Sequence, residues 1–353
     1  MSLFKTASEI AIMKSVSNAK PFALNGKLHY RMMSIGVLYW CTIVVSLRRA
    51  FRGPLIPGWS WAFEVATHFL RRQTAKAFDM ADPNDGREYE DSLVFHSPAL
   101  EQVIIEPVSS PVKGHWFRTK KQSHDVTLLY LHGGGYAYYS AAHHNLISLV
   151  TLAAGSQTFT LDYRLIPEHP FPAQLEDARN AYRWLLEKGV SSKRLVVAGD
   201  SAGGNLVLAL LLSLRDSNVP LPAVAICIAP WTDVANSGES MVKNERFDWV
   251  QKRMADQWSV WLRNGADART PLLSPIRADL RGLPPIYIQA GGAEILHDMI
   301  KEFADRAQQQ NALVALDVWP TMNHDFQAYG DTILESKQAL SRIGEVVQKY
   351  VAN

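Results

Sequence analysis

The chain has 353 residues, of which 47% are hydrophobic and 20% are charged, a balance that excludes a largely disordered protein. Its net charge of +2 gives no reason to expect nucleic-acid binding. The sequence also lacks a P-loop, a dinucleotide fingerprint and zinc-type Cys/His spacing, so we expect no cofactor and no metal.

The first 95 residues differ from the remainder in pattern and in charge. Residues 1–80 contain 11 Lys/Arg and 3 Asp/Glu, a net charge of +8, whereas residues 81–353 contain 25 Lys/Arg and 31 Asp/Glu, a net charge of −6. Residues 1–95 are helical in pattern and rich in aromatic side chains. We therefore predict an N-terminal helical cap over 1–95, which could place Trp40 or Trp59 in a substrate pocket.

An uncharged run of 16 residues, from Met32 to Leu47, lies between Arg31 and Arg48. A helix needs about 20 apolar residues to span a bilayer, so we do not expect this run to be transmembrane. A buried cap helix is the preferred interpretation, and a basic helix lying on a membrane surface is the alternative.

Two further features bear on location. The first residues lack the apolar core of a secretory signal. Cys41 and Cys227 are the two cysteines, and we expect both to be buried free thiols of a reducing compartment. A cytoplasmic location is therefore expected.

From about Gln102 onward, short β-rich segments alternate with longer helical patterns. The expected strands are residues 101–108, 115–119, 126–132, 158–163, 194–199, 223–229, 286–291 and 313–319, and the expected helices are 172–188, 202–216, 295–310 and 333–350. This alternation predicts an α/β fold with a mostly parallel sheet covered on both faces, and the first two or three strands could pair antiparallel at one edge. Residues 231–270 interrupt the alternation, so we expect a second cap segment inserted in a catalytic domain of residues 96–353.

The segment RLVVAGDSAGGNLVLALLL contains the pattern G-x-S-x-G at residues 199–203. An apolar strand precedes the pattern and an apolar helix follows it, which is the context in which a serine hydroxyl is exposed at the edge of a sheet. Ser201 could instead be a helix N-cap, but a cap does not need glycine-rich surroundings. We therefore predict that Ser201 is a nucleophile.

A serine nucleophile needs a base and a carboxylate that orients the base, and after such a turn the acid precedes the histidine in the chain. His324 directly follows the predicted strand 313–319, whereas His297 lies inside a helical pattern. Glu294 follows the strand 286–291 and is the predicted acid, with Asp298, one helical turn later, as the fallback. Because a base must be neutral, activity is expected to rise with pH through a pKa of about 7.

Three glycines, Gly133-Gly134-Gly135, follow the predicted strand 126–132. Glycine lets the backbone approach a ligand closely, and backbone N–H groups stabilise the oxyanion that develops in acyl transfer. The predicted donors are Gly134, Gly135 and Ala202, the residue after the nucleophile. Tyr136, beside this loop, is predicted to contact substrate.

Four motifs carry a family resemblance: HGGGY at 132–136, DYRLIPEHPFPA at 162–173, GDSAGG at 199–204, and the segments around Glu294 and His324. From about residue 95 to its end, the chain resembles the GDSAGG subgroup of the hormone-sensitive lipase-like family of bacterial carboxylesterases. The resemblance implies an α/β-hydrolase core with a helical cap, the triad Ser201, Glu294 and His324, no cofactor or metal, and hydrolysis of short- to medium-chain carboxylic esters. Aspartate is the more frequent acid in that family, so Glu294 departs from it.

Two rival functions use the same fold. An amidase or aryl-acylamide deacetylase would use identical machinery, whereas a small-molecule binding protein would have lost the histidine that is present here as His324. The expected partner is a small ester and not a nucleic acid. Peripheral membrane contact through residues 1–80 and a homodimer are left open.

Overall fold

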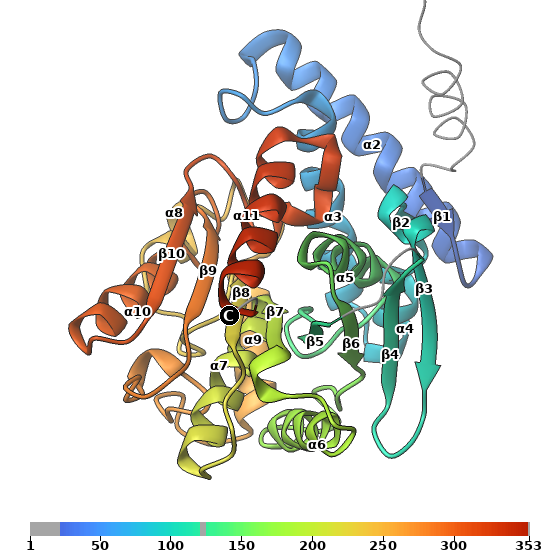
Figure 1. Ribbon diagram of the computed structural model, residues 1–353. Coiled ribbons are helices and arrows are strands. Elements are labelled where there is room, and N and C mark those ends of the chain that lie inside the picture. Colours follow the sequence, from blue (N-terminus) through green and yellow to red (C-terminus); the bar gives the residue numbers. More distant parts are fainter. Residues whose placement is uncertain (1–21, 121–124, 352–353) are drawn as a thin grey trace, which may run out of the picture.

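The structure is a computed structural model that describes residues 22–120 and 125–351. Its centre is an eight-stranded sheet in the order β10-β9-β8-β7-β5-β6-β4-β3 (Figure 1). The strands are β3 Val103–Val108, β4 Gly114–Thr119, β5 Thr127–Leu131, β6 Gln157–Leu161, β7 Leu195–Asp200, β8 Val224–Ile228, β9 Ile286–Gly291 and β10 Val314–Trp319. The strands from β10 to β6 are parallel, and β4 is antiparallel to both β6 and β3. The predicted parallel sheet with an antiparallel edge is confirmed.

Helices cover both faces of the sheet. One face carries α5 Ala141–Ala154 and α11 Leu334–Val351, and the other carries α6 Ala173–Glu187, α7 Ser201–Asp216 and α10 His297–Gln309. In β5, Leu128 and Tyr130 belong to the cluster that contains α5 and α11, whereas Leu129 and Leu131 belong to the cluster that contains α6 and α7. Because successive side chains of a strand point to opposite faces, the central strands are apolar throughout. Short 3-10 helices occur at Pro98–Gln102, Ser192–Arg194, Pro275–Arg277 and Phe326–Thr332.

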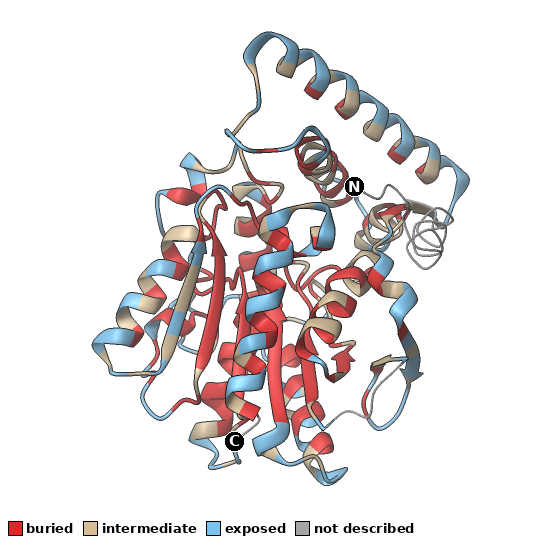
Figure 2. Cartoon of the chain, turned by 45° about the horizontal axis from the view of Figure 1, so that its top comes forward, coloured by how far each residue is buried: buried red, intermediate tan, exposed pale blue. Residues whose placement is uncertain are grey.

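The N-terminal region contains α2 Leu28–Arg52, α3 Trp61–Phe78, α4 Pro83–Glu90 and a two-stranded sheet of β1 Phe22–Leu24 and β2 Leu93–Phe95. The fully buried carboxylate of Glu64 holds α2 and α3 together. It pairs with Arg48, lies 2.8 Å from Nη1 of Arg49, and accepts the backbone N–H of Leu55 at 3.2 Å. Figure 2 shows α2 along the outside of the molecule.

The second interruption of the α/β pattern contains α8 Ser240–Lys243 and α9 Lys252–Arg263. Arg71 of α3 joins this second cap segment to the N-terminal region. Nη1 of Arg71 donates to the carbonyl oxygens of Glu245 at 2.6 Å and Asp248 at 2.7 Å. Cys41 and Cys227 are buried and free, as predicted.

Strands β5 and β7 lie side by side, and the chain leaves them in opposite directions, to β6 and to β8. Parallel sheets bind ligands outside the carboxyl ends of strands at such a reversal of strand order. The glycine loop follows β5, and Ser201 follows β7. The topology therefore brings these two predicted parts of the site together.

Candidate active site

Ser201 occupies a strained turn between β7 and α7. Its φ of 53° lies in the left-handed region, which residues other than glycine rarely adopt. A Cβ atom on Gly203 would collide with the carbonyl oxygen of Leu131 in β5, so glycine is needed for α7 to approach the sheet this closely. The turn places Ser201 at the N-terminus of α7, where the helix dipole favours negative charge.

His324 and Glu294 form a buried pair. Nδ1 of His324 lies 2.8 Å from Oε2 of Glu294, and neither side chain is exposed. The other carboxylate oxygen of Glu294 accepts the backbone N–H of Gly291 at 3.0 Å. Glu294 is thereby fixed at the end of β9, and the pairing orients the imidazole ring on the loop after β10.

Asp298 lies one helical turn beyond Glu294 and points to a different partner. Its Oδ2 accepts the backbone N–H of Ser240 at 2.8 Å, at the start of α8. The hydroxyl of Ser240 in turn accepts the N–H of Asp298 at 3.1 Å. The Asp298 carboxylate therefore holds the cap segment, while Glu294 is the carboxylate bonded to the histidine.

Asp248 and Trp249, in the second cap segment, connect the two loops that carry this pair. Oδ2 of Asp248 accepts the backbone N–H of Ile295 at 2.7 Å, next to Glu294. Nε1 of Trp249 donates to the carbonyl oxygen of His324 at 2.8 Å. Sequence reasoning missed this connection, because a single Asp-Trp dipeptide in an insertion gives no sign of its partners.

The glycine loop has the geometry of an anion-binding turn. Gly134 and Gly135 have φ values of 90° and 61°. No described residue accepts a hydrogen bond from the backbone N–H of either glycine. A Cβ atom on Gly133 would collide with the carboxylate of Asp200, so the loop lies directly against the Ser201 turn. Ala202 is in the first turn of α7, where helix N–H groups lack intrahelical acceptors.

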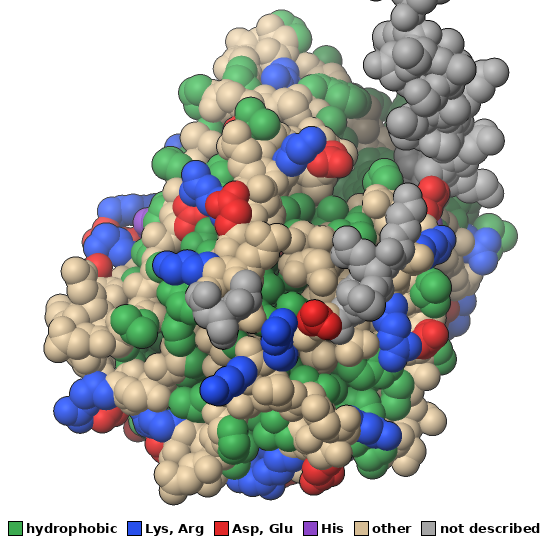
Figure 3. Space-filling view, in the orientation of Figure 1, with side chains coloured by type: hydrophobic (Ala, Val, Ile, Leu, Met, Phe, Trp, Pro, Cys, Tyr) green, Lys and Arg blue, Asp and Glu red, His purple; other side chains and the backbone are tan. Residues whose placement is uncertain are grey.

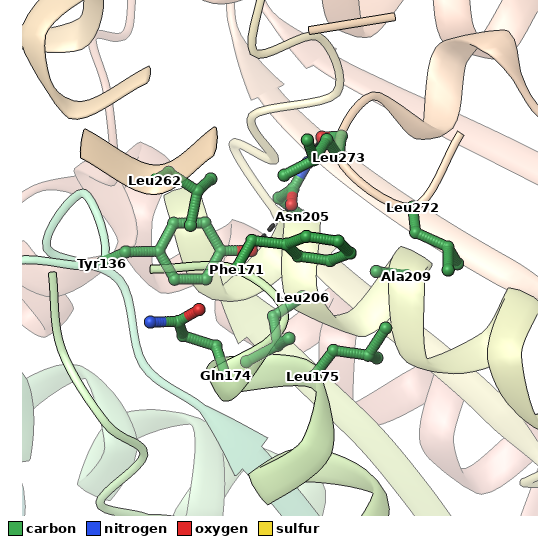
Figure 4. Close-up of a pocket in the computed structure, with 10 residues that line it drawn as sticks. All are labelled: Tyr136, Phe171, Gln174, Leu175, Asn205, Leu206, Ala209, Leu262, Leu272 and Leu273. Carbon is green, nitrogen blue, oxygen red and sulfur yellow. Dashed lines mark hydrogen bonds between the residues drawn. The ribbon is translucent and has the colours of Figure 1, made fainter. Parts of the chain in front are cut away.

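The three residues predicted to contact substrate lie apart from one another. Tyr136 is buried, its hydroxyl donates to Oδ1 of Asn205 at 2.7 Å, and it lines an apolar cavity of about 10 Å³ (Figure 4), about the room one water molecule needs. Trp59 is buried, and its Nε1 donates to the carbonyl oxygen of Thr321 at 2.7 Å, so it supports the His324 loop. Trp40 lies on α2 and is 54% exposed.

An aromatic side chain that the sequence did not single out packs on the glycine loop instead. A Cβ atom on Gly135 would collide with the indole ring of Trp258, a buried residue of α9. The centroid of the Tyr138 ring lies 6.2 Å from the centroid of the Trp258 ring. The second cap segment therefore supplies a wall beside the predicted oxyanion donors.

Buried carboxylates surround His324. Burial opposes the charged imidazolium, but the carboxylates of Asp325, Glu294 and Asp248 outweigh burial and raise the pKa of His324 to about 10. Oδ2 of Asp325 lies 3.2 Å from Nε2 of the ring. Burial raises the pKa of Asp248 and that of Asp200 to about 6 each. The structure therefore moves the pKa of the base upward from the ordinary histidine value.

The profile of a family described as the alpha/beta hydrolase fold matches residues 128–328. An acetyl-hydrolase of Streptomyces hygroscopicus is 42% identical over 256 residues, which cover 70% of this chain and 84% of the relative. Among solved structures, a variant of the esterase E40 has a TM-score of 0.75 at 37% identity, covering 80% of this chain and 95% of that one. An esterase from the bacterial hormone-sensitive lipase family has a TM-score of 0.70 at 32% identity, and the match covers 93% of this chain and 100% of that one.

These similarities confirm the predicted fold and the predicted class of reaction, the hydrolysis of carboxylic esters by a serine hydrolase. The family profile covers more than half of the chain, and the acetyl-hydrolase is matched over more than two thirds of its length. The chain therefore belongs to the α/β-hydrolase family and, within it, to the bacterial hormone-sensitive lipase group of esterases.

Proposed function

We propose that the chain hydrolyses esters of short carboxylic acids through an acyl-enzyme formed on Ser201. The observation that carries this proposal is the placement of Ser201 at φ 53° between the glycine loop and the sheet edge that also holds the 2.8 Å Glu294–His324 pair. In this proposal Glu294 is the acid of the triad, and Gly134, Gly135 and Ala202 are the oxyanion donors.

The reaction has two matching halves. Nε2 of His324 takes the proton of the Ser201 hydroxyl as its oxygen attacks the ester carbonyl carbon. The three backbone N–H groups hold the oxyanion, and His324 then gives its proton to the departing alcohol as the C–O bond breaks. Water attacks the acyl-serine in the same way, which releases the carboxylic acid and restores Ser201. Glu294 stabilises the imidazolium in both halves.

The preference for a short acyl group rests on Trp258. Its ring fills the space next to Gly135, and Tyr138 extends the same wall, so this side of the site has little room for a long chain. The name of the Streptomyces relative, an acetyl-hydrolase, points the same way. A smaller side chain at residue 258 would open that wall.

The test is kcat/KM on p-nitrophenyl esters from acetate to palmitate, with p-nitroacetanilide as the amide. We expect a maximum at acetate or butyrate and a fall of about tenfold or more by octanoate, because a filled pocket rejects added methylenes. Trp258→Leu should move the maximum to longer acyl groups, whereas Trp261→Leu, on the same helix, should leave it in place. A maximum at palmitate would overturn the short-acyl proposal, and faster cleavage of the anilide than of the acetate would make the chain an amidase.

Replacing Asp325 with asparagine is expected to shift the pH profile of activity. The carboxylate of Asp325 stabilises the imidazolium form of His324 and so raises its pKa, which places the rising limb of the profile above pH 6.5. Removing that negative charge lowers the pKa, so the neutral base should be present at lower pH and the limb should move down by about one pH unit or more. Asp331→Asn, at an exposed carboxylate, is the control. An unmoved limb in Asp325→Asn would contradict this account of the base.

A further inference from the structure

Helix α2 presents a continuous apolar strip to solvent, which we call the outer face of α2. Its members recur every three or four residues and so share one side of the helix. They are Leu28, Met32, Ile35, Tyr39, Ile43, Leu47 and Phe51, with exposed fractions from 37% to 85%. Figure 2 shows the outer side of α2 as exposed, and Figure 3 shows hydrophobic side chains at the surface in that part of the molecule.

The opposite side of α2 is packed against the protein. Tyr30, Ser34, Cys41 and Val45 are buried, and the hydroxyl of Ser34 lies 2.7 Å from that of Ser92. These contacts fix the rotation of the helix, so the outer face cannot turn inward without unpacking the buried side. By length and composition alone α2 could cross a membrane, and only 22% of its most apolar stretch is buried. The expectation of a buried cap helix therefore holds for one side of α2 only.

The outer face has the size of a protein's principal apolar patch and is small for a dimer interface. A helix of 25 residues is about 37 Å long, and a strip about 10 Å wide along it covers about 400 Å². The largest apolar patch on a typical soluble monomer covers about 300–600 Å² and is often functional. Two copies that paired these strips would bury about 800 Å² in total, less than the roughly 1,200 Å² of a stable, specific interface. A second copy of the chain is therefore not favoured as the occupant.

The charges around the outer face match an anionic surface. Residues 22–63 contain five Lys/Arg and no Asp/Glu. The basic residues flank the uncharged run at both ends: Lys27 and Arg31 precede it, and Arg48, Arg49 and Arg52 follow it. Glu64 neutralises part of the charge of Arg48 and Arg49, and Asp85 and Glu88 pair with Lys27. Arg52 is exposed.

The aromatic residues near the outer face fit the same partner. Tyr39 and Trp40 are both more than half exposed. Trp61 of α3 is 46% exposed, and its Nε1 donates to the hydroxyl of Ser46 of α2 at 3.0 Å. Amphipathic aromatic rings of this kind are enriched at the boundary between lipid and water. An apolar face with aromatic residues and basic flanks is typical of a helix that lies in the plane of an anionic bilayer.

We propose that the outer face of α2 docks the chain on an anionic lipid surface, with the helix parallel to that surface. The α2–α3 connection links this helix to the His324 loop, because it contains Trp59, which bonds to Thr321, three residues before His324. The binding does not require ester hydrolysis, so it stands or falls independently of the proposed function.

The test is sedimentation of the full chain with vesicles of phosphatidylcholine alone and of phosphatidylcholine mixed with phosphatidylglycerol, at low and high salt. We expect binding to the anionic vesicles that weakens at high salt, and weaker binding to the neutral ones. The triple variant Met32→Gln, Tyr39→Gln, Leu47→Gln should reduce the partition coefficient by about tenfold or more, because three apolar side chains no longer enter lipid. Leu313→Gln with Leu334→Gln is the matched control, since both leucines are more than 60% exposed elsewhere.

Circular dichroism of each variant shows that the fold is intact, and light scattering reports the oligomeric state. Absence of binding to anionic vesicles by the folded chain would overturn the proposal, as would equal binding by the triple variant. A dimer that the triple variant converts to a monomer would make the outer face a contact between copies. Binding that appears only after deletion of residues 1–21 would make that segment the occupant. Each of these two results also overturns the proposal.

Discussion

Replacing Ser201 with alanine is expected to reduce hydrolysis of p-nitrophenyl acetate by about 10⁴-fold or more, because it removes the hydroxyl that carries the acyl group. The alanine variant should keep its circular dichroism and melting temperature, since Ser201 lies at the start of α7 and is not part of the apolar core. Initial rates at saturating substrate, measured on purified protein, check this.

Ser217→Ala is the matched control, because Ser217 caps the other end of the same helix. It should keep full activity. A folded Ser201→Ala variant that retained about a tenth of the activity would exceed any residual catalysis expected from the oxyanion donors alone, and the proposed mechanism would be wrong.

Replacing Glu294 with glutamine is expected to cost about 10⁴-fold in kcat, the size of effect seen when the base of a comparable triad is left in the wrong tautomer. Glutamine keeps the size of the side chain but removes the negative charge of the carboxylate, whose Oε2 lies 2.8 Å from Nδ1 of His324. Asp298→Asn is the matched control. It alters the carboxylate that bonds to Ser240 and should change kcat far less.

The ranking of these two variants is the result that matters. If Asp298→Asn lost more activity than Glu294→Gln, with both proteins folded, then the working enzyme would use the other carboxylate. The pH profile of Glu294→Gln gives a second readout, because loss of this carboxylate should also lower the pKa of His324.

The central sheet was predictable because its strands are buried on both faces. Segments such as 194–199 and 286–291 are short, apolar and followed by turn residues, a pattern typical of parallel sheets. Helix α5 was not predicted. Its segment AAHHNLISLVTLAA has two histidines in its first turn and follows a glycine-rich loop, so periodicity alone does not mark its start.

The histidine and its carboxylate were predictable from chain order, since each directly follows a strand whose carboxyl end must lie at one edge of the sheet. Glu294 and His324 meet there at 2.8 Å. The assignment of catalytic roles to them, and to Ser201, stays a prediction until the variants are measured.

The surroundings of the site were not predictable in the same way. Asp248 and Trp249 bond to catalytic loops that lie tens of residues away in the sequence, and their local sequence pattern does not indicate those partners. Asp325 is adjacent to His324 in sequence, yet its effect on the pKa depends on a side-chain distance of 3.2 Å. The role of the aromatic residues depends likewise on packing, as the positions of Trp40 and Trp258 illustrate.

The run from Met32 to Leu47 shows why apolar composition alone does not locate a helix. An apolar sequence predicts that a surface avoids water, but it does not say whether protein or lipid covers that surface. In the structure one side of α2 is buried against residues of the described ranges 22–120 and 125–351, and the other side is exposed among them.

The central claim is that the hydrolysis proceeds through an acyl group on Ser201, and covalent trapping tests it most directly. The chain is treated with a fluorophosphonate and analysed by intact mass and peptide mapping. The account predicts one adduct per chain on the peptide that contains Ser201, loss of esterase activity in proportion to labelling, and no adduct in Ser201→Ala. Loss of activity with the label on another residue, or unchanged activity after complete labelling of Ser201, would contradict it.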